Sequence, residues 1–411
     1  LPKVGLKTPI SYAVAALITA LLIVPATPGS TSTTFQVGSA REWVTIPNIT
    51  VPSLVTIVVL AVLMAAAAVW AWLQARDRRP APVWLHVAVG LTLILAFLTY
   101  VGAGTTSVIP MVSLLGGALA LSVPLVFGAM SGVICERSGI INIAIEGQMI
   151  AGAFAAVIAS SAVGSPWVGL ITAPIAGVGV AALLGMFTIK YRVDNIIVGV
   201  VLNMLAIGLT SFLFSVIFVG ASAGLNKALA LPALPIPVLS GIPVIGPVLF
   251  NQSILVYLAY ALVLVLHVAL FRTRWGLHTR SVGEHPKAAD TVGIKVNALR
   301  WRNVLIGGAM AGMGGAMFTI GMGLAFSKNM VAGNGYIALA AMILGGWRPL
   351  GAAAASLLFG FATNLGFVLQ TIDAPIPTEV VLMIPYVVTL LAVGGFVKSA
   401  IAPAGIGKPY P

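Results

Sequence analysis

The sequence is poor in charge and has almost no cysteine. Only 7% of its 411 residues are charged and 60% are hydrophobic, whereas a soluble domain carries about 25% charged and 45–50% apolar residues. This balance excludes a water-soluble globular enzyme and a disordered chain. Cys135 is the single cysteine, which excludes an intrachain disulfide and a Cys-x-x-Cys metal site. What remains is a polytopic membrane protein.

Long apolar segments follow one another along the chain. About twelve are visible, near residues 9–25, 52–73, 83–104, 110–134, 140–163, 166–189, 195–219, 251–271, 303–324, 335–346, 349–370 and 378–397. Most can cross a hydrocarbon core about 30 Å thick, but the segment 335–346 is too short. It predicts a half-helix, which the membrane tolerates only where protein or a cavity covers the backbone. We predict an all-α fold of about 10–12 transmembrane helices, several of them broken.

Lys and Arg follow the even-numbered apolar segments. Such residues mark cytoplasmic loops, so we expect both termini in the cytoplasm. The long stretches 26–51 and 220–250 hold only Arg41 and Lys227 as cations, so we place them outside. Residues 147–187 and 335–361 are also faintly similar to each other. In each stretch, a helix rich in small residues is followed by Pro-Trp or Trp-Arg-Pro and then by a second helix rich in small residues. Two such repeats are common in transporters.

One cytoplasmic loop, residues 272–302, holds seven of the 21 cations and a polar centre. Pro286 suits the first turn of a helix, where its missing N–H costs nothing, and Gly293 stands where a helix would stop. The pattern predicts a helix of about seven residues that docks a partner. A solvated basic loop without a partner explains the composition equally well.

Four motifs resemble the permease subunits of bacterial ABC importers for nucleosides and simple sugars, in the branched-chain amino acid/ribose permease superfamily. The first runs from Arg272 through Val282-Gly283-Glu284-His285-Pro286-Lys287-Ala288-Ala289 and resembles the coupling helix of these permeases. The others are 136–149 (ERSGIINIAIEGQM), 193–203 (VDNII with LN) and 335–351 (GYIALAA with WRPLG). The resemblance spans roughly residues 110–397.

This resemblance implies one permease half of an ATP-driven importer for nucleosides, or for a pentose or another simple sugar. It implies a cytoplasmic ABC ATPase, with two fused nucleotide-binding domains, that binds ATP and Mg, and an extracellular substrate-binding lipoprotein. It also implies a second, different permease subunit and a place in the bacterial inner membrane. We expect no cofactor, no metal and no nucleic acid on this chain, and contact with membrane lipid. The ATPase would contact Gly283, Glu284, His285, Pro286, Lys287, Ala288, Ala289 and Asp290.

The resemblance divides the chain into three parts. Residues 1–105 form an N-terminal extension with two or three transmembrane helices and an outside loop. Residues 106–400 form the permease core, and residues 401–411 form a cytoplasmic tail.

The tail sequence Gly405-Ile406-Gly407-Lys408 lacks the first Gly, the Ser/Thr and the strand of a phosphate loop, so the chain shows no ATPase motif of its own.

Polar residues inside apolar segments are the candidates for the substrate pathway, and they are Asn142, Glu146, Gln148, Asn203 and Asn364. A carboxylate at the centre of a membrane helix costs about 2.5–3.5 kcal/mol, so Glu146 needs a partner. Arg137, Gln148 and Asn142 are the nearest in sequence. Such residues either contact a polar substrate or bridge helices, and both interpretations stay open here.

A secondary transporter or channel is the alternative of another class. It would require embedded acidic or basic residues to couple ions. Apart from Glu136, Arg137 and Glu146, the apolar segments hold almost none, which disfavours it. A membrane enzyme is disfavoured because the sequence shows no catalytic constellation.

Overall fold

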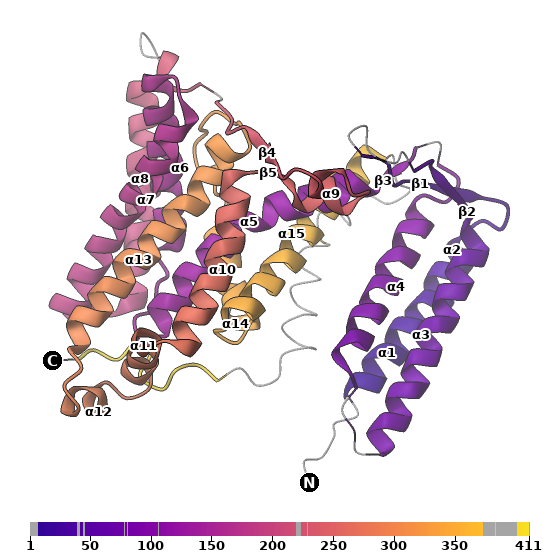
Figure 1. The fold of residues 1–411 in the computed structure, drawn as a ribbon, viewed down its shortest axis with the longest axis horizontal. Helices are drawn as coiled ribbons and strands as arrows, with labels where there is room; N and C mark the ends of the chain where they lie inside the picture. The colour runs from indigo at the N-terminus through magenta and orange to yellow at the C-terminus, as the bar shows by residue number, and fades with distance from the viewer. Residues whose placement is uncertain are drawn as a thin grey trace. The chain divides into compact units, whose positions relative to one another are not determined.

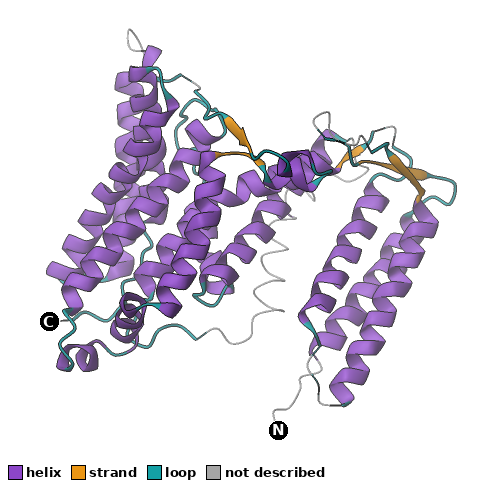
Figure 2. Cartoon of the chain, in the orientation of Figure 1, coloured by secondary structure: helices purple, strands orange, loops and turns teal. Residues whose placement is uncertain are grey.

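The computed structural model describes residues 7–38, 42–43, 46–77, 79, 81–105, 107–218, 223–227, 229–372, 383 and 401–410. Among them, ten helices are long and apolar enough to cross a membrane, and helices dominate the described chain (Figure 2). The prediction of a polytopic helical membrane protein is confirmed. The described residues also form five short strands, which the sequence did not predict. The predicted segment 378–397 lies, except for Met383, outside the described residues.

The chain forms two compact units. Unit 1 comprises residues 1–116, 237–248 and 363–396, and unit 2 comprises residues 117–236, 249–362 and 397–411. The helices α5 (Met111–Glu136), α9 (Ile245–Leu249) and α15 (Pro349–Thr371) each contain residues of both units. The predicted boundary at residues 105/106 stays a prediction.

Unit 1 contains a bundle of three apolar helices, α1 (Lys7–Ile18), α3 (Ser53–Arg76) and α4 (Val83–Val101). A π-helical turn (Thr19–Ile23) and α2 (Val24–Ala26) extend α1. A small sheet follows, in which β1 (Ser32–Gln36) pairs antiparallel with β2 (Ile49–Pro52) and parallel with β3 (Ile109–Pro110). The bundle buries only a narrow apolar stripe that includes Tyr12, Met64 and Leu85. Its remaining apolar surface is exposed, as expected of helices that face lipid.

Unit 2 holds most of the other helices. The long ones are α5 (Met111–Glu136), α6 (Ile145–Val163), α7 (Pro166–Gly185), α8 (Asn195–Ile217), α10 (Ile254–Arg272), α13 (Val296–Ala316) and α15 (Pro349–Thr371). The short ones are α11 (Arg274–Glu284), α12 (Pro286–Thr291) and α14 (Asn334–Leu344). The strands β4 (Ala233–Pro235) and β5 (Asn251–Ser253) pair antiparallel. The π-helical turns Met186–Lys190 and Met317–Gly321, which share the sequence Met-Phe-Thr-Ile, end α7 and α13.

Glycines allow α6, α7 and α13 to pack with their backbones in contact. A Cβ on Gly152 of α6 would overlap the backbone of Gly312 on α13, and a Cβ on Gly177 of α7 would meet the same turn of α13. Close approach of this kind supplies van der Waals contact, which drives helix association in lipid. The three helices lie side by side in unit 2 (Figure 1).

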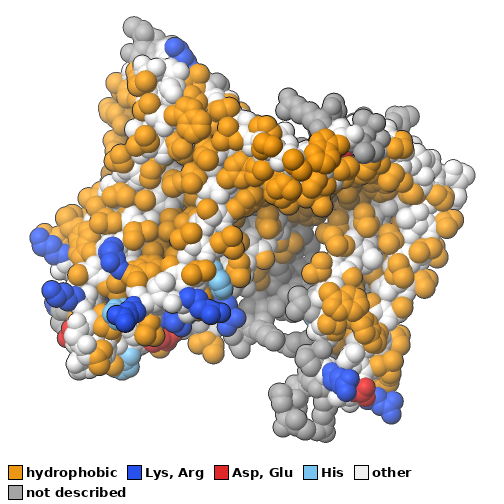
Figure 3. Space-filling view, in the orientation of Figure 1, with side chains coloured by type: hydrophobic (Ala, Val, Ile, Leu, Met, Phe, Trp, Pro, Cys, Tyr) orange, Lys and Arg blue, Asp and Glu red, His pale blue; other side chains and the backbone are white. Residues whose placement is uncertain are grey.

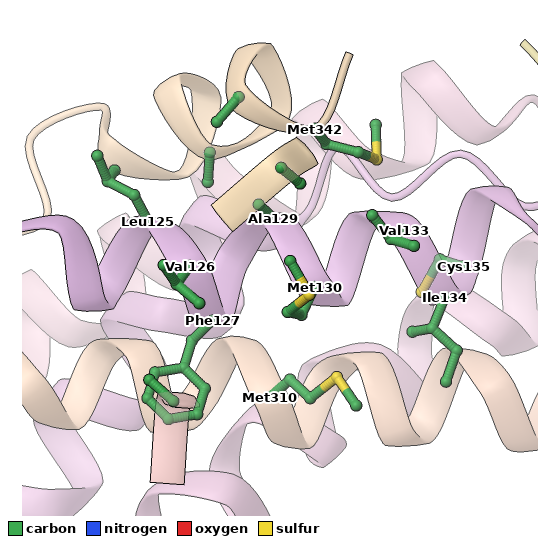
Figure 4. Packing of buried hydrophobic residues seen from close by; sticks show 14 of the residues in the cluster. Leu125, Val126, Phe127, Ala129, Met130, Val133, Ile134, Cys135, Met310 and Met342 are labelled. Atoms are coloured by element: carbon green, nitrogen blue, oxygen red, sulfur yellow. The ribbon is translucent and has the colours of Figure 1, made fainter. Parts of the chain in front are cut away.

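The core of unit 2 is built around α5, most of which is buried. Its side chains Phe127, Met130 and Ile134 face α13 and Met310, and Met342 of α14 lies on the other side (Figure 4). A helix that is apolar all round and buried is typical of a membrane protein core. This core holds the C-terminal end of α5 in place, and a polar link to α6 follows directly after it.

Candidate functional site

The link between α5 and α6, residues 137–144, carries a buried polar cluster. Asn142 donates one N–H to the Ser131 hydroxyl at 3.0 Å and another to the Gln148 Oε1 at 3.0 Å. Gln148 returns a bond from its Nε2 to the Asn142 Oδ1 at 3.2 Å. Asn142 and Gln148 are fully buried, so the two amides satisfy each other where water has no access. The predicted helix 140–163 therefore begins five residues late, at Ile145.

Glu146 binds the first turn of the half-helix α14. Its Oε1 accepts the N–H of Gly333 and its Oε2 accepts the N–H of Gly335, both at 2.7 Å. The expectation of a partner close in sequence was wrong, because the partners lie about 190 residues away along the chain. The first N–H groups of a helix have no partner within it, and the helix dipole favours a negative charge there. This carboxylate satisfies both requirements.

The other end of α14 is held by the end of α5. Arg137 donates to the carbonyl of Trp347 from Nε at 3.0 Å and to that of Gly346 from Nη2 at 3.3 Å. Glu136 accepts the indole N–H of Trp347 at 2.6 Å. Burial lowers the pKa of the Arg137 guanidinium, and the Glu284 carboxylate opposes that shift. The segment 136–146 thus places the cation of Arg137 at the C-terminal end of α14 and the anion of Glu146 at its N-terminal end, the arrangement that the helix dipole favours, while the Glu136 carboxylate at the C-terminal end is held by the indole N–H of Trp347.

Asn203 joins α8 to the same cluster. It accepts the N–H of Gly147 at 2.8 Å and donates to the carbonyl of Ile143 at 2.8 Å and to the hydroxyl of Tyr336 at 3.0 Å. Asp194 begins α8 by accepting the N–H groups of Ile196 and Ile197. The structure therefore brings together four of the five residues predicted from polarity.

Asn364 is the fifth, and it lies elsewhere. It donates to the carbonyls of Ser113 and Leu114 in the first turn of α5, at 3.4 and 2.8 Å. All three residues belong to unit 1. Asn364 therefore bridges α15 and α5 and takes no part in the cluster of Asn142, Glu146, Gln148 and Asn203.

The loop 272–302, which the sequence predicts to dock a partner, contains two helices, α11 and α12. His285 caps α12 by accepting the N–H of Ala288 at 3.2 Å, and Pro286 occupies its first turn, as predicted. Gly293 ends it at φ +83°, with the N–H of Ile294 reaching the carbonyl of Ala289, a Schellman termination. The helix is one residue shorter than expected, and α11 before it was not predicted.

The two faces of α12 differ in character. Ala289 is buried with Val282 and Val296 in a small apolar cluster. Lys287, Ala288 and Asp290 are exposed. The exposed face is the part of α12 that a partner can contact.

The C-terminal tail ties this loop to the α5–α6 link. Gly405 donates its N–H to the carbonyl of Gly283, and Gly407 donates to that of Gly139. Arg300 of α13 donates to the carbonyls of Ser138 and Lys408, both at 3.1 Å. A hydrogen bond with Asp290 raises the pKa of the Tyr410 phenol. The tail, α11 and α12 lie at the same end of unit 2 (Figure 1).

Sequence reasoning missed Tyr336 and the backbone of Gly333 and Gly335. Tyr336 stands inside the quoted stretch Gly335–Ala341, but an aromatic residue on an apolar segment gives no signal of its own. It is 48% exposed, whereas Asn142, Glu146, Gln148 and Asn203 are at most 2% exposed. Tyr336 is therefore where the polar cluster reaches the surface of unit 2.

Comparison with known proteins identifies relatives over most of the chain. The family model described as "Branched-chain amino acid transport system / permease component" matches residues 114–393. The nucleoside ABC transporter permease protein NupC of Lactococcus lactis is 40% identical over 301 residues, which cover 71% of this chain and 94% of the relative. The guanosine ABC transporter permease protein NupQ of Bacillus subtilis is 39% identical over 308 residues, with the same coverage.

A third relative is named for a different substrate. The putative glucose ABC transporter permease protein TsgC13 of Haloferax volcanii is 30% identical over 256 residues, which cover 61% of this chain and 76% of the relative. No solved structure matches the chain.

Proposed function

Because this chain belongs to the family of branched-chain amino acid transport system permease components, we propose that it forms half of the translocation pathway of an ABC importer for nucleosides. The choice of nucleosides as the substrate rests on the identity of about 40% to two permeases named for nucleoside and guanosine transport, over 94% of their length. The relative named for glucose is less similar and less completely covered. A pentose or another simple sugar is the second candidate substrate.

The polar cluster supports this role in two ways. Its buried members, Asn142, Glu146, Gln148 and Asn203, fix the start of α6 and the half-helix α14 through bonds that leave little free hydrogen-bonding capacity. Tyr336 on α14 then presents an aromatic ring and a hydroxyl at the exposed edge. An aromatic ring with a polar group suits a nucleoside, which has a stacking face and hydroxyls. We place Tyr336 on the wall of the pathway, with the four buried residues as its support.

The exposed face of α12 is the proposed contact for the ATPase. The partner would bind ATP and Mg and would carry two fused nucleotide-binding domains, while a lipoprotein outside the cell would deliver the substrate. A second, different permease would complete the pathway. Movement of α12 would reach the α5–α6 link through α11, since a Cβ on Gly283 would overlap the carbonyl oxygen of Arg137. This assignment places the loop 272–302 and both termini in the cytoplasm.

Uptake of radiolabelled substrate tests the function. Cells with the gene should accumulate labelled guanosine, adenosine or uridine, and cells without it should not. Excess unlabelled glucose or ribose should leave this uptake unchanged. Uptake of the sugars with no uptake of nucleosides would contradict the nucleoside assignment while keeping the permease assignment.

Two tryptophan variants test the ATPase contact. Ala288 lies on the exposed face of α12, so Ala288→Trp should prevent co-purification of the ATPase while the membrane part stays folded. Leu277→Trp is the control, since Leu277 is an exposed residue of α11 outside the proposed contact. Normal ATPase retention and substrate-stimulated ATP hydrolysis with Ala288→Trp would show that the loop is only a solvated connector.

A further inference from the structure

Two hollows on the surface of unit 2 share Arg302. One is an apolar open groove of about 440 Å³, which includes Val265 of α10 and Ile306 of α13. The other, of about 470 Å³, includes His278 and Lys295. Both volumes lie within the range of ligand sites, about 300–1,000 Å³. Arg302 therefore lines both an apolar groove and a basic hollow.

The groove lies between two membrane-spanning helices. Leu262, Val265 and Ala269 line it from α10, and Ile306 and Met310 line it from α13. Buried Ile134 of α5 forms part of its floor. Arg302 is its only charged lining residue among the described residues. Such a slot accepts a hydrocarbon chain and gives a polar solute nothing to bind.

The second hollow has the opposite character. His278, Lys295 and Arg302 line it, and none of its lining residues within the described chain is acidic. Lys and Arg side chains gather at this end of unit 2, with hydrophobic side chains above them (Figure 3). A basic pocket at the cytoplasmic end of membrane helices is suited to an anionic lipid headgroup.

Trp275 marks the boundary between the two hollows. Its ring lines the groove, and the guanidinium of Arg302 lies 5.8 Å from the ring centroid. Trp is enriched at the level of the headgroups, and a cation over its face is stabilised by the ring. The pair thus holds the guanidinium of Arg302 beside the apolar groove, where the phosphate of a lipid in the groove can reach it.

We propose that this composite site binds one anionic phospholipid. Its phosphate contacts Arg302 and Lys295, and one acyl chain lies in the groove between α10 and α13. The opposed chemistry of the two hollows argues for a single amphipathic ligand. The proposal does not depend on the transported substrate.

Lipid retention by the full-length chain, purified together with the second permease, tests the site. The protein, in mild detergent, is offered phosphatidylglycerol and phosphatidylcholine with identical acyl chains, and bound lipid is counted by native mass spectrometry. We expect one phosphatidylglycerol to be retained in preference to phosphatidylcholine. Inorganic phosphate at millimolar concentration should not displace it, because phosphate lacks the chain that fills the groove.

Matched variants separate the two halves of the site. Arg302→Gln should weaken retention about fivefold, the value expected for one cation near the membrane surface, whereas Arg274→Gln on the neighbouring α11 should not. Val265→Trp should fill the groove and reduce retention by a similar factor. Val268→Trp is its control, since Val268 is an exposed residue of α10 that does not line the groove. Val265 is 64% exposed, so a larger side chain there leaves the fold intact.

Three results would overturn the proposal. Equal losses with Arg274→Gln and Arg302→Gln would mean diffuse attraction to a basic surface. Unchanged retention with Val265→Trp would show that no chain occupies the groove. Loss of the second permease with Val265→Trp, without loss of lipid, would identify the groove as a protein interface.

Discussion

The carboxylate of Glu146 is the contact between α6 and α14 whose loss we expect to be most costly. In Glu146→Gln, the amide oxygen still accepts one backbone N–H of α14, but the amide NH₂ faces the other and leaves it unpaired. A hydrogen bond to a charged group contributes about 1.5–3 kcal/mol, and the charge at the helix end contributes up to about 2 kcal/mol. Removing a buried charge also removes its desolvation cost, which offsets part of the loss. We expect a net destabilisation of about 2–3 kcal/mol.

Cys135 provides the assay. It is the only cysteine in the sequence and is fully buried in unit 2, so a maleimide dye that fluoresces on thiol reaction reports unfolding as the protein is heated. At about 2–4 °C per kcal/mol for a unit of this size, Glu146→Gln should lower the Tm by roughly 5–10 °C.

Glu136→Gln is the matched control for Glu146→Gln. Glu136 is also buried and is 4% exposed, but its carboxylate accepts only one N–H, that of Trp347, so an amide oxygen can still accept it and no donor is left unpaired. Its Tm should fall clearly less than that of Glu146→Gln. Equal Tm values for the unaltered protein and Glu146→Gln would refute the assigned role of this carboxylate at α14.

Three further predictions use the same melting assay. Arg137→Lys should cost about 1–2 kcal/mol, because one ammonium cannot reproduce the planar pair of bonds to Gly346 and Trp347; an unchanged Tm would contradict the second anchor of α14. Gly152→Ala should lower the Tm because its Cβ would lie 2.6 Å from the Gly312 Cα, whereas Gly179→Ala, with open space around it, should leave it unchanged or raise it; equal effects would contradict the close packing of α6 and α13. Ala289→Trp should destabilise by about 1–3 kcal/mol through overpacking, and Ala288→Trp should not; the reverse order would mean that the two faces of α12 are wrongly assigned.

The sequence by itself determined the class of the protein and most of its helices. Continuous apolar segments of about 20 residues have one stable form in a bilayer, a helix that satisfies its own backbone. The ten spans of the described residues and the half-helix α14 were therefore predictable. Their ends fall within five residues of the prediction, except that α13 begins at Val296, seven residues before the predicted segment 303–324, because its first two turns are polar. Pro286 and Gly293 act through their own backbone geometry, and they predicted the limits of α12. These signals are local, and local physics suffices to interpret them.

Only the tertiary structure decided which groups the polar side chains bind. Nothing near Glu146 in the sequence indicates that its carboxylate binds the backbone of Gly333 and Gly335, because a backbone N–H has no sequence signature and becomes available only where a helix starts. The separation of Asn364 from the other polar residues was equally hidden, since one asparagine on an apolar helix resembles another. The same holds for the groove beside Arg302, which exists only because residues of α5, α10 and α13 line one hollow. Contacts between segments distant in sequence depend on packing, and packing is a property of the whole chain.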